Sequence, residues 1–293
     1  MTTPSEAAPT WRELWRSTSE RLGDPAPTRW LLEEASGADG AALLCRLDEE
    51  AGPEATARLE SLVRRRLAGE PLQHVLGHWG FRALEVAVDA RVLVPRPETE
   101  SLVTFALREL DRLCGTRPGG HALAVDLGTG SGVIALSLVA ERANVRVIAT
   151  DRSAGALEVV ASNLSRISAE AAGRVELRRG DWYLALPRDA AGQIDLIVAN
   201  PPYLAEREWA GLEPAVRDFD PIEALVAGPG GLEAIEAILA GAPAWLTRPG
   251  AVLLEIAPDQ EGSALELAHD AGFGSAAVEE DLAGRPRVLV AGL

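Results

Sequence analysis

The sequence has little of several features that usually mark a class of protein. It has two cysteines, Cys45 and Cys114, and no Cys-x-x-Cys pair, so neither a disulfide framework nor a metal site is predicted. No run of about 18 uncharged apolar residues occurs, which argues against a membrane-spanning helix and a membrane partner. Residues 1–10 lack a charged segment followed by an apolar one, so no secretory signal is expected. These absences predict a cytoplasmic protein.

Positive charge is also scarce. Lysine is absent, and 28 arginines against 44 aspartates and glutamates leave a formal net charge of −16. A protein that binds nucleic acid nonspecifically needs a basic surface to replace the counterions of the phosphates. The single basic run, residues 64–66, is expected to be the solvated face of a helix. No direct nucleic-acid partner is therefore expected.

The rest of the composition is that of a globular protein, 47% hydrophobic and 25% charged over 293 residues. This length allows one medium domain and one small domain. Residues 1–75 are predicted to form a helical domain, in which Thr10 and Glu13 form a capping box. Residues 76–97 mostly alternate apolar and polar side chains and are predicted to form a β-hairpin linker. Residues 98–293 are predicted to form the larger domain.

Strand and helix patterns alternate through the larger domain. Strands are predicted at 122–127, 145–150, 175–177, 194–199, 251–256 and 287–290, with helices at 132–142, 153–167, 231–246 and 261–271. Such alternation with short loops predicts an α/β fold with a doubly wound, mostly parallel sheet.

A glycine-rich turn follows the first predicted strand. It reads Asp126-Leu127-Gly128-Thr129-Gly130-Ser131-Gly132. Glycines let the backbone pass close beneath a ligand, and nucleotides bind at this place in open α/β sheets. The acid before the turn would repel a pyrophosphate but suits a cationic ligand. The alternative is a tight structural turn beside a helix-capping aspartate.

Two further positions support a nucleoside site. Asp151 ends the second predicted strand, where a carboxylate can accept both ribose hydroxyls. Asp181 and Trp182 follow the third strand and could bind adenine, although a tryptophan is more often simply packed. S-adenosyl-L-methionine is a nucleoside with a sulfonium and no phosphate, so it fits these features better than NAD does.

The strongest signal is the segment Asn200-Pro201-Pro202-Tyr203 at the end of the fourth predicted strand. Two prolines stiffen the exit from the strand and hold Asn200 at the edge of the sheet. The Asn200 and Pro201 carbonyl oxygens can together accept from one planar NH2 group, with Tyr203 as an aromatic wall beside it. That group could belong to adenine, guanine or a glutamine side chain. The alternative is a stiff loop with an asparagine cap.

Together these motifs resemble a class I S-adenosylmethionine-dependent methyltransferase of the amino-methylating kind. Two upstream stretches make the resemblance more specific: Gly69-Glu70-Pro71-Leu72-Gln73-His74-Val75-Leu76-Gly77 and Arg91-Val92-Leu93-Val94-Pro95-Arg96-Pro97-Glu98-Thr99-Glu100. Both are similar to the HemK/PrmC family, which methylates the side-chain amide nitrogen of glutamine in the Gly-Gly-Gln loop of peptide-chain release factors. The similarity extends over about residues 55–293.

The resemblance implies a fold, a donor and a substrate. The fold would be the mostly parallel doubly wound sheet, with an antiparallel last strand, behind a small helical domain that recognises the substrate. Residues 98–293 would bind S-adenosyl-L-methionine and carry catalysis, and release factors would be the partner. The donor site would comprise Asp126, Gly128, Thr129, Gly130, Ser131, Gly132, Asp151, Asp181, Trp182 and Asn200. The catalytic and substrate-binding residues would be Asn200, Pro201, Pro202 and Tyr203, and the stretch Pro95–Glu100, with Arg96 and Glu98, would line a pocket or form a rigid linker.

Four other functions can be weighed against the sequence. An adenine or guanine methyltransferase would share the logic of Asn200 but should carry basic patches, which the net charge of −16 disfavours. Another protein glutamine could be the substrate. A noncatalytic adaptor would have no chemical need for Gly128, Gly130, Asp151 and Asn200. An NAD oxidoreductase fails on the glycine spacing.

Overall fold

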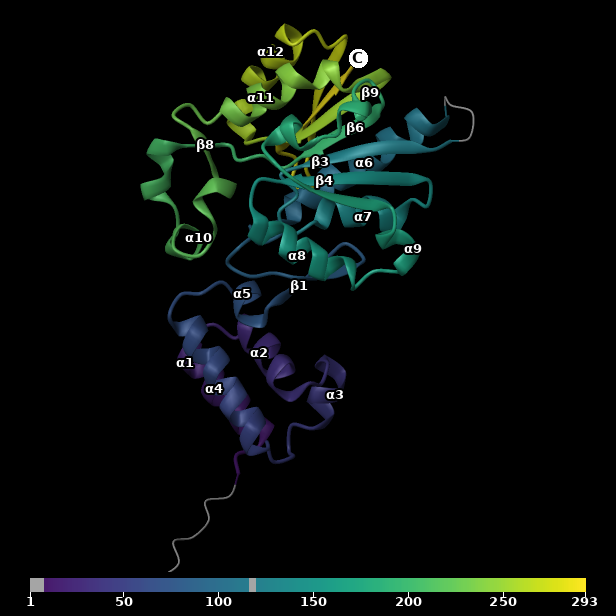
Figure 1. Cartoon of the computed structure of the whole chain (residues 1–293). Helices are drawn as coiled ribbons and strands as arrows, with labels where there is room; N and C mark the ends of the chain where they lie inside the picture. The colour runs from purple at the N-terminus through teal and green to yellow at the C-terminus, as the bar shows by residue number, and fades with distance from the viewer. Residues whose placement is uncertain (1–7, 116–119) are drawn as a thin grey trace, which may run out of the picture. The chain divides into compact units, whose positions relative to one another are not determined.

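The computed structural model describes residues 8–115 and 120–293, which divide into two compact units (Figure 1). The first unit contains the chain up to Gly77 together with Pro214–Phe219, and the second contains His78–Glu213 and Asp220–Leu293. In the described part of the chain, no helix is both long and apolar enough to cross a membrane.

The first unit is helical. Its helices are α1 (Trp11–Leu22), α2 (Ala26–Ser36), α3 (Gly40–Cys45), α4 (Pro53–Leu67), α5 (Leu72–Leu76) and the short α10 (Pro214–Arg217). The capping box at Thr10 is confirmed, since its hydroxyl accepts from the Glu13 backbone and the Glu13 carboxylate accepts from the Thr10 backbone. Apolar side chains at helical spacing, including Trp11, Leu31 and Val63, form its buried interior.

The second unit is built on a seven-stranded sheet with the order β10-β11-β9-β6-β3-β4-β5. The strands are β3 (Ala122–Leu127), β4 (Val145–Asp151), β5 (Val175–Arg179), β6 (Ile194–Ala199), β9 (Leu246–Glu255), β10 (Ser275–Glu280) and β11 (Pro286–Gly292). The five strands from β9 to β5 are parallel, whereas β11 is antiparallel to both β9 and β10. The predicted fold class is therefore confirmed.

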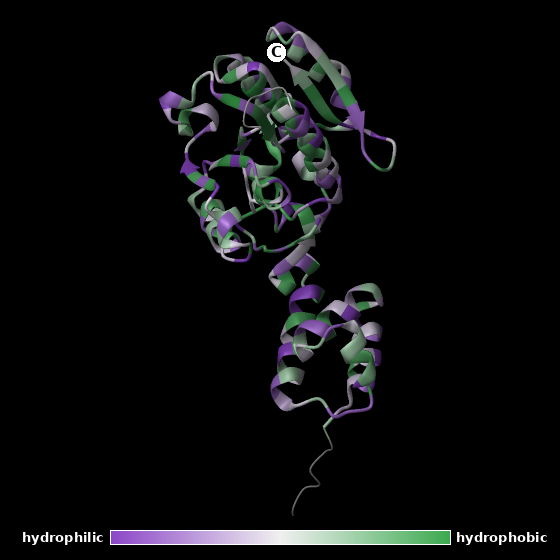
Figure 2. Ribbon diagram, turned by 90° about the vertical axis from the view of Figure 1, so that its right-hand side faces the viewer, coloured by the Kyte–Doolittle hydropathy of each residue, from purple (hydrophilic) through white to green (hydrophobic). Residues whose placement is uncertain are grey.

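Helices cover both faces of this sheet because successive side chains of each central strand point to opposite sides. On β3, Ala124 packs into the core beneath α6 (Pro97–Gly115) and α7 (Val133–Glu141). Its neighbour Val125 packs into the core beneath α11 (Glu233–Gly241) and α12 (Glu261–Asp270). Figure 2 shows the hydrophobic colour concentrated along the central strands. The other helices described in this unit are α8 (Ala154–Leu164) and α9 (Ala169–Ala172).

Shorter elements connect this framework. Two small sheets are formed by β1 (His78–Phe81) with β2 (Leu84–Ala87), and by β7 (Leu204–Ala205) with β8 (Val226–Gly228). The 3-10 turns are η1 (Trp182–Ala185), η2 (Arg188–Ala190), η3 (Glu206–Gly211), η4 (Ile222–Ala224), η5 (Ala242–Ala244) and η6 (Pro258–Gln260). The pair β7–β8 ties the segment after Asn200 to residues 226–228.

Several elements differ from the sequence prediction, for example β9, which begins at Leu246 where a helix over 231–246 was expected to end. The alternation continues to Val94, but the hairpin ends at Ala87 and residues 92–96 are irregular, because prolines at 95 and 97 cannot donate ladder hydrogen bonds. Helix α6 was not predicted, and it begins with Pro97 in its first turn, a position that proline favours. The edge strand β10 was also missed, because its mostly exposed side chains carry no apolar run.

Candidate active site

A cavity of about 620 Å³ lies at the carboxyl ends of the parallel strands in the second unit. Its walls come from residues 91–96, 128–131, 133–134, 151–153, 180–182, 200, 202, 221, 223–224 and 226–227, together with Thr99, Ala156, Glu233 and Ala234. The chain reverses its direction across the sheet between β3 and β6, and ligands of open α/β sheets bind at this kind of switch point. The volume suits a ligand of nucleoside size.

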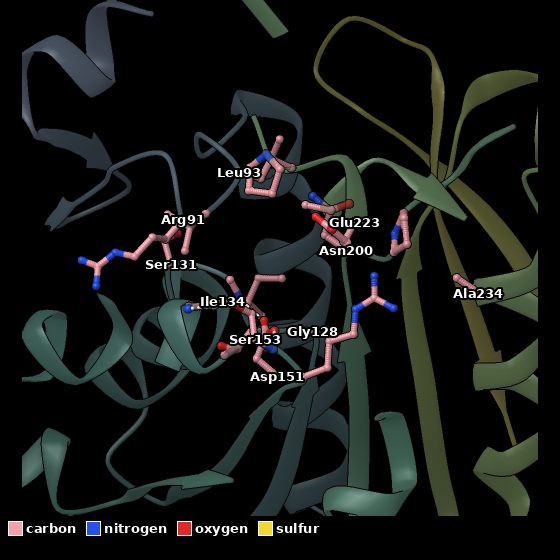
Figure 3. A pocket seen from close by; sticks show the side chains of 18 of the residues that line it. Arg91, Leu93, Gly128, Ser131, Ile134, Asp151, Ser153, Asn200, Glu223 and Ala234 are labelled. Atoms are coloured by element: carbon pink, nitrogen blue, oxygen red, sulfur yellow. Dashed lines mark hydrogen bonds between the residues drawn. The ribbon is translucent and has the colours of Figure 1, made fainter. Parts of the chain in front are cut away.

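Most of the predicted site residues meet in this cavity. Those that line it are Arg96, Gly128, Thr129, Gly130, Ser131, Asp151, Asp181, Trp182, Asn200 and Pro202. Those that do not line it are Asp126, Gly132, Pro201, Tyr203 and Glu98. In Figure 3, Gly128 and Asp151 lie toward one end of the cavity, and Asn200 and Glu223 toward the other. The two strongest sequence signals, the glycine turn and Asn200, therefore face one space.

The glycines of the turn serve different purposes. All three have positive φ, +72° at Gly128, +57° at Gly130 and +85° at Gly132, a region that other residues rarely adopt. A Cβ on Gly130 would meet no protein atom and would project beside the cavity. A Cβ on Gly132 would come within 2.9 Å of Val160. Gly130 thus leaves room for a ligand, whereas Gly132 allows α7 and α8 to pack closely.

Asp126 lies beneath the turn and is fully buried. Its Oδ2 accepts from the Thr129 hydroxyl at 2.6 Å and from the Ala135 backbone at 3.1 Å. Its Oδ1 has no hydrogen-bond partner among the described residues. Burial raises the pKa of Asp126 to about 7, and the nearby Asp151 carboxylate adds to the rise. Asp126 therefore links the glycine turn to the first turn of α7 through Oδ2, while Oδ1 can still accept a hydrogen bond.

Asp151 stands at the end of β4 and lines the cavity. Its Oδ2 accepts from the Gly130 backbone at 3.0 Å, and its Oδ1 accepts from the Ser153 backbone at 2.8 Å. A carboxylate has about four lone-pair positions, so two hydrogen bonds fix its orientation and leave acceptor capacity for a ligand. Its position beside the turn fits a diol of a ribose.

Trp182 forms another part of the wall. Its φ of +42° is unusual for a bulky residue and is a local strain of the kind found at ligand sites. Its ring lies about 3.5 Å from the Cβ position of Gly128, which is an ordinary van der Waals distance. The ring also packs against the core under α11. The residue thus presents an aromatic surface to the cavity while it is anchored in the core.

The lining of the cavity carries slightly more acidic than basic side chains, and its basic side chains are Arg91, Arg96 and Arg152. Two of the arginines that line it are already engaged: Arg96 pairs with the buried Asp220 at 2.7 Å, and Arg91 pairs with Asp89 and Glu158. The carboxylates Asp151, Asp181, Glu223 and Glu233 also line the wall. This acceptor-rich lining fits the sulfonium and amino groups of S-adenosylmethionine.

Asn200 follows β6 directly, and its amide is held from one side. Its Nδ2 donates to the Thr99 hydroxyl at 3.2 Å, and that hydroxyl donates to Glu255 Oε2 at 2.7 Å. The amide oxygen of Asn200 is thereby directed away from Thr99. Because Asn200 lines the cavity, this oxygen is available to a hydrogen-bond donor there.

The next residues of the motif support the turn from behind. Pro201 is buried, and Pro202 lines the cavity. The Tyr203 backbone donates to the Leu225 carbonyl at 3.2 Å, and its own carbonyl accepts from Gln260. Tyr203 is not in the cavity wall, and burial together with the nearby Glu255 raises its pKa. Its predicted role as an aromatic wall beside the substrate stays a prediction.

The stretch Pro95–Glu100 divides between wall and support. Pro95, Arg96 and Thr99 line the cavity. Glu98 accepts from Arg285 at 2.9 Å and Glu100 accepts from the Arg82 backbone, so both are engaged elsewhere.

Comparison with known proteins agrees with this geometry. Residues 18–77 match the PrmC N-terminal domain, and residues 113–212 match the methyltransferase small domain. A release factor glutamine methyltransferase from Xylella fastidiosa is 40% identical over 277 residues, which is 94% of this chain and 96% of the relative. Another from Cereibacter sphaeroides is 41% identical over 90% of each chain. The chain belongs to the release factor glutamine methyltransferase family.

Membership of the release factor glutamine methyltransferase family confirms the predicted resemblance and, with it, methyl transfer from S-adenosylmethionine. Solved structures agree on the fold. The catalytic domain of hMettl16 in complex with a MAT2A 3′UTR hairpin has a TM-score of 0.54 and 17% identity, over 82% of this chain and 81% of that one. The N-terminal domain of human METTL16 in complex with SAH has a TM-score of 0.51 and 16% identity, over 82% of each chain.

Sequence reasoning missed several members of the site of this methyltransferase. Thr99 lay unmarked within the quoted stretch 91–100, and Glu223 and Glu233 follow no motif. Glu255 did carry a signal, because it is the one charged residue in the otherwise apolar run 251–256. Buried charges are rare without a partner or a function, so its position alone marks it for attention.

Proposed function

We propose that this chain transfers a methyl group from S-adenosylmethionine to the side-chain amide nitrogen of glutamine in the Gly-Gly-Gln loop of peptide-chain release factors. The observation that carries the proposal is the single cavity that unites the glycine turn, Asp151 and Asn200. The curated relatives with 40–41% identity over most of the chain bear the name of this activity.

The donor half of the cavity would be formed by Asp151, Asp181 and Trp182. Asp151 keeps free lone pairs for the ribose hydroxyls, Asp181 can accept from the exocyclic amine of adenine, and the Trp182 ring supplies a surface for the base. When bound, the donor would supply a methyl group to the acceptor nitrogen, with its carbon–sulfur bond breaking as the carbon–nitrogen bond forms and with one amide N–H proton released. Gly130 leaves room for the ligand beside the turn.

The acceptor half would be formed around Asn200, which lines the cavity. An amide nitrogen is a poor nucleophile because its lone pair is delocalised, so its position must supply much of the rate. The Asn200 oxygen would accept a hydrogen bond from one N–H of the glutamine, whereas Pro201, whose carbonyl is the predicted acceptor for the other, does not line the cavity. Holding a reactant in a near-attack geometry can lower a barrier by as much as about 7–11 kcal/mol.

We further propose roles for the three parts of the chain. Residues 1–75 would recognise the release factor, 76–97 would link the two domains, and 98–293 would bind the donor and carry catalysis. The match of residues 18–77 to the PrmC N-terminal domain supports a distinct first part. A substrate that acts in translation supports a cytoplasmic location for the enzyme. The net charge of −16 favours a protein substrate over nucleic acid.

Radiolabelled methyl transfer to purified release factors tests the function. Label should enter a wild-type release factor and should not enter one whose Gly-Gly-Gln glutamine is replaced by alanine. The Asn200→Ala enzyme should retain the donor but lose turnover, because the lost interaction matters chiefly in the transition state. Label that entered RNA or DNA and no release factor would contradict the proposed substrate.

A further inference from the structure

A buried carboxylate stands behind the asparagine of the cavity and is connected to it through one hydroxyl. Glu255 ends β9 and is 1% exposed. Thr99, in the first turn of α6, donates its hydroxyl hydrogen to Glu255 Oε2 at 2.7 Å and accepts from Asn200 Nδ2 at 3.2 Å. Three segments far apart in sequence thus form one continuous line of hydrogen bonds that ends at the cavity.

The direction of these hydrogen bonds is determined by the number of available hydrogens. An ionised carboxylate only accepts, and a threonine hydroxyl has a single hydrogen to give. When Glu255 is ionised, Thr99 must donate that hydrogen to Glu255, so it can only accept a hydrogen bond from Asn200. The asparagine then presents its NH2 to Thr99 and its oxygen to the cavity. A flipped amide would place two oxygens, those of Thr99 and Asn200, together without a hydrogen between them.

We propose that Glu255 and Thr99 are positioning residues that fix the amide of Asn200 with its oxygen toward the acceptor glutamine. The inference rests on the proposed function, because it assigns the purpose of this orientation to methyl transfer onto an amide. A flipped Asn200 would offer NH2 to the NH2 of the substrate, and two donors cannot form a hydrogen bond.

The arrangement depends on the charge of Glu255. Burial raises the pKa of Glu255 to about 7, against the lowering effect of the Thr99 hydrogen bond and of Arg287 and Arg96. Glu98 raises this pKa further, and the Tyr203 phenol also lies near the carboxylate. A protonated Glu255 can donate to Thr99, and Thr99 can then donate to either side. Below about pH 7 the orientation of Asn200 is therefore no longer enforced, and turnover falls.

Four variants separate this positioning from general stability. Thr99→Val removes the hydroxyl at nearly constant volume, and Glu255→Gln removes the titrating group. Thr99→Ser keeps the hydroxyl. Thr104→Val is the matched control, because Thr104 lies on the same helix as Thr99 but its hydroxyl is hydrogen-bonded to the Glu100 carbonyl and to Arg82, outside the cavity.

Kinetics at several pH values provide the first readout. We expect kcat at pH 8 to fall about five- to tenfold in Thr99→Val, the rate equivalent of one net hydrogen bond, with the KM for the donor unchanged. The loss of turnover below pH 7 should be present in the wild type, Thr99→Ser and Thr104→Val, and absent in Thr99→Val and Glu255→Gln. The proposal would be overturned if Thr99→Val had the same kcat as the wild type. It would also be overturned if Glu255→Gln lost as much turnover below pH 7 as the wild type does.

A substrate-free measurement separates this inference from the proposed function. NMR can follow the side-chain amide signals of Asn200, which are assigned by their disappearance in Asn200→Asp. These signals should shift with pH in the wild type and in Thr99→Ser. They should be insensitive to pH around 7 in Glu255→Gln. Wild-type signals that do not respond near pH 7 would refute the coupling. A clear response in an enzyme that methylates no release factor would uphold the coupling and refute the proposed function instead.

Discussion

Replacement of Asp126 by asparagine should change how the stability of the second unit depends on pH. The side chain is fully buried, and its Oδ2 accepts from Thr129 and from the Ala135 backbone. Burial, aided by the Asp151 carboxylate, raises its pKa from 3.8 to about 7. Asparagine retains an oxygen for both hydrogen bonds and cannot ionise, so the substitution isolates the effect of the charge.

The sign and the size follow from linkage. Between pH 3.8 and about 7 the folded state keeps a proton at Asp126 that the unfolded state has released, so stability declines as pH rises through this range. Each pKa unit corresponds to about 1.36 kcal/mol, so the full loss is about 4 kcal/mol, of which roughly 2–3 kcal/mol falls between pH 5 and 8. Asp126→Asn abolishes this contribution. Its stability relative to the wild type should therefore improve by the same amount over this interval.

Urea denaturation at pH 5 and pH 8 measures the effect as a difference between two proteins. The other carboxylates and the helical unit contribute equally to both proteins and cancel in the difference. Thr129→Val serves as the control, because it removes a hydrogen bond to Asp126 and keeps the carboxyl group, so the pH dependence should persist. A difference between Asp126→Asn and the wild type that stayed constant from pH 5 to 8 would refute the assignment of a raised pKa.

Three further predictions concern the cavity. Asn200→Ala should keep donor affinity, measured by calorimetry, within about twofold of the wild type yet lower kcat by at least about a hundredfold. If donor affinity and kcat fell by equal factors, Asn200 would have no special role in the transition state. Asp151→Ala should weaken donor binding by about 1.5–3 kcal/mol per lost charge-assisted bond, and unchanged affinity by calorimetry would exclude it from the site. Gly130→Ala should mainly weaken donor binding and have a smaller effect on the melting temperature. Gly132→Ala, whose Cβ would meet Val160 at 2.9 Å, should mainly lower the melting temperature. The reverse result would contradict the roles given to the two glycines.

Much of the fold could be predicted because its central strands are short, continuous apolar runs. Both β3 (Ala122–Leu127) and β6 (Ile194–Ala199) begin and end at the predicted residues. They are buried on both faces, and such strands are distinct from amphipathic helices in length and composition. The edge strand β10 could not be found in this way, since solvent covers most of its side chains. Helix α6 was hidden by the prolines at its start, which resemble a linker in sequence.

The site could be predicted where function depends on backbone turns at strand ends. The glycine turn and Asn200 were recognisable because glycine and proline leave strong local signals. Whether a given side chain in those turns faces the cavity was not predictable, so Gly132 and Tyr203 could not be told from their neighbours. The hydrogen bond between Thr99 and Glu255 joins residues that are 156 positions apart in the sequence, and no local sequence pattern specifies such a pairing.

The passage of the chain between the two units has a consequence for dissecting the enzyme. After Glu213 the chain leaves the second unit, contributes Pro214–Phe219 to the helical unit, and returns at Asp220. Asp220, the first residue after this segment, forms a salt bridge with Arg96 in the cavity wall. Cutting the protein after Gly77 would therefore strip this short segment of its partners directly beside a residue that supports the wall. The helical unit is consequently not a detachable module, and exchanging it between relatives requires exchanging residues 214–219 as well.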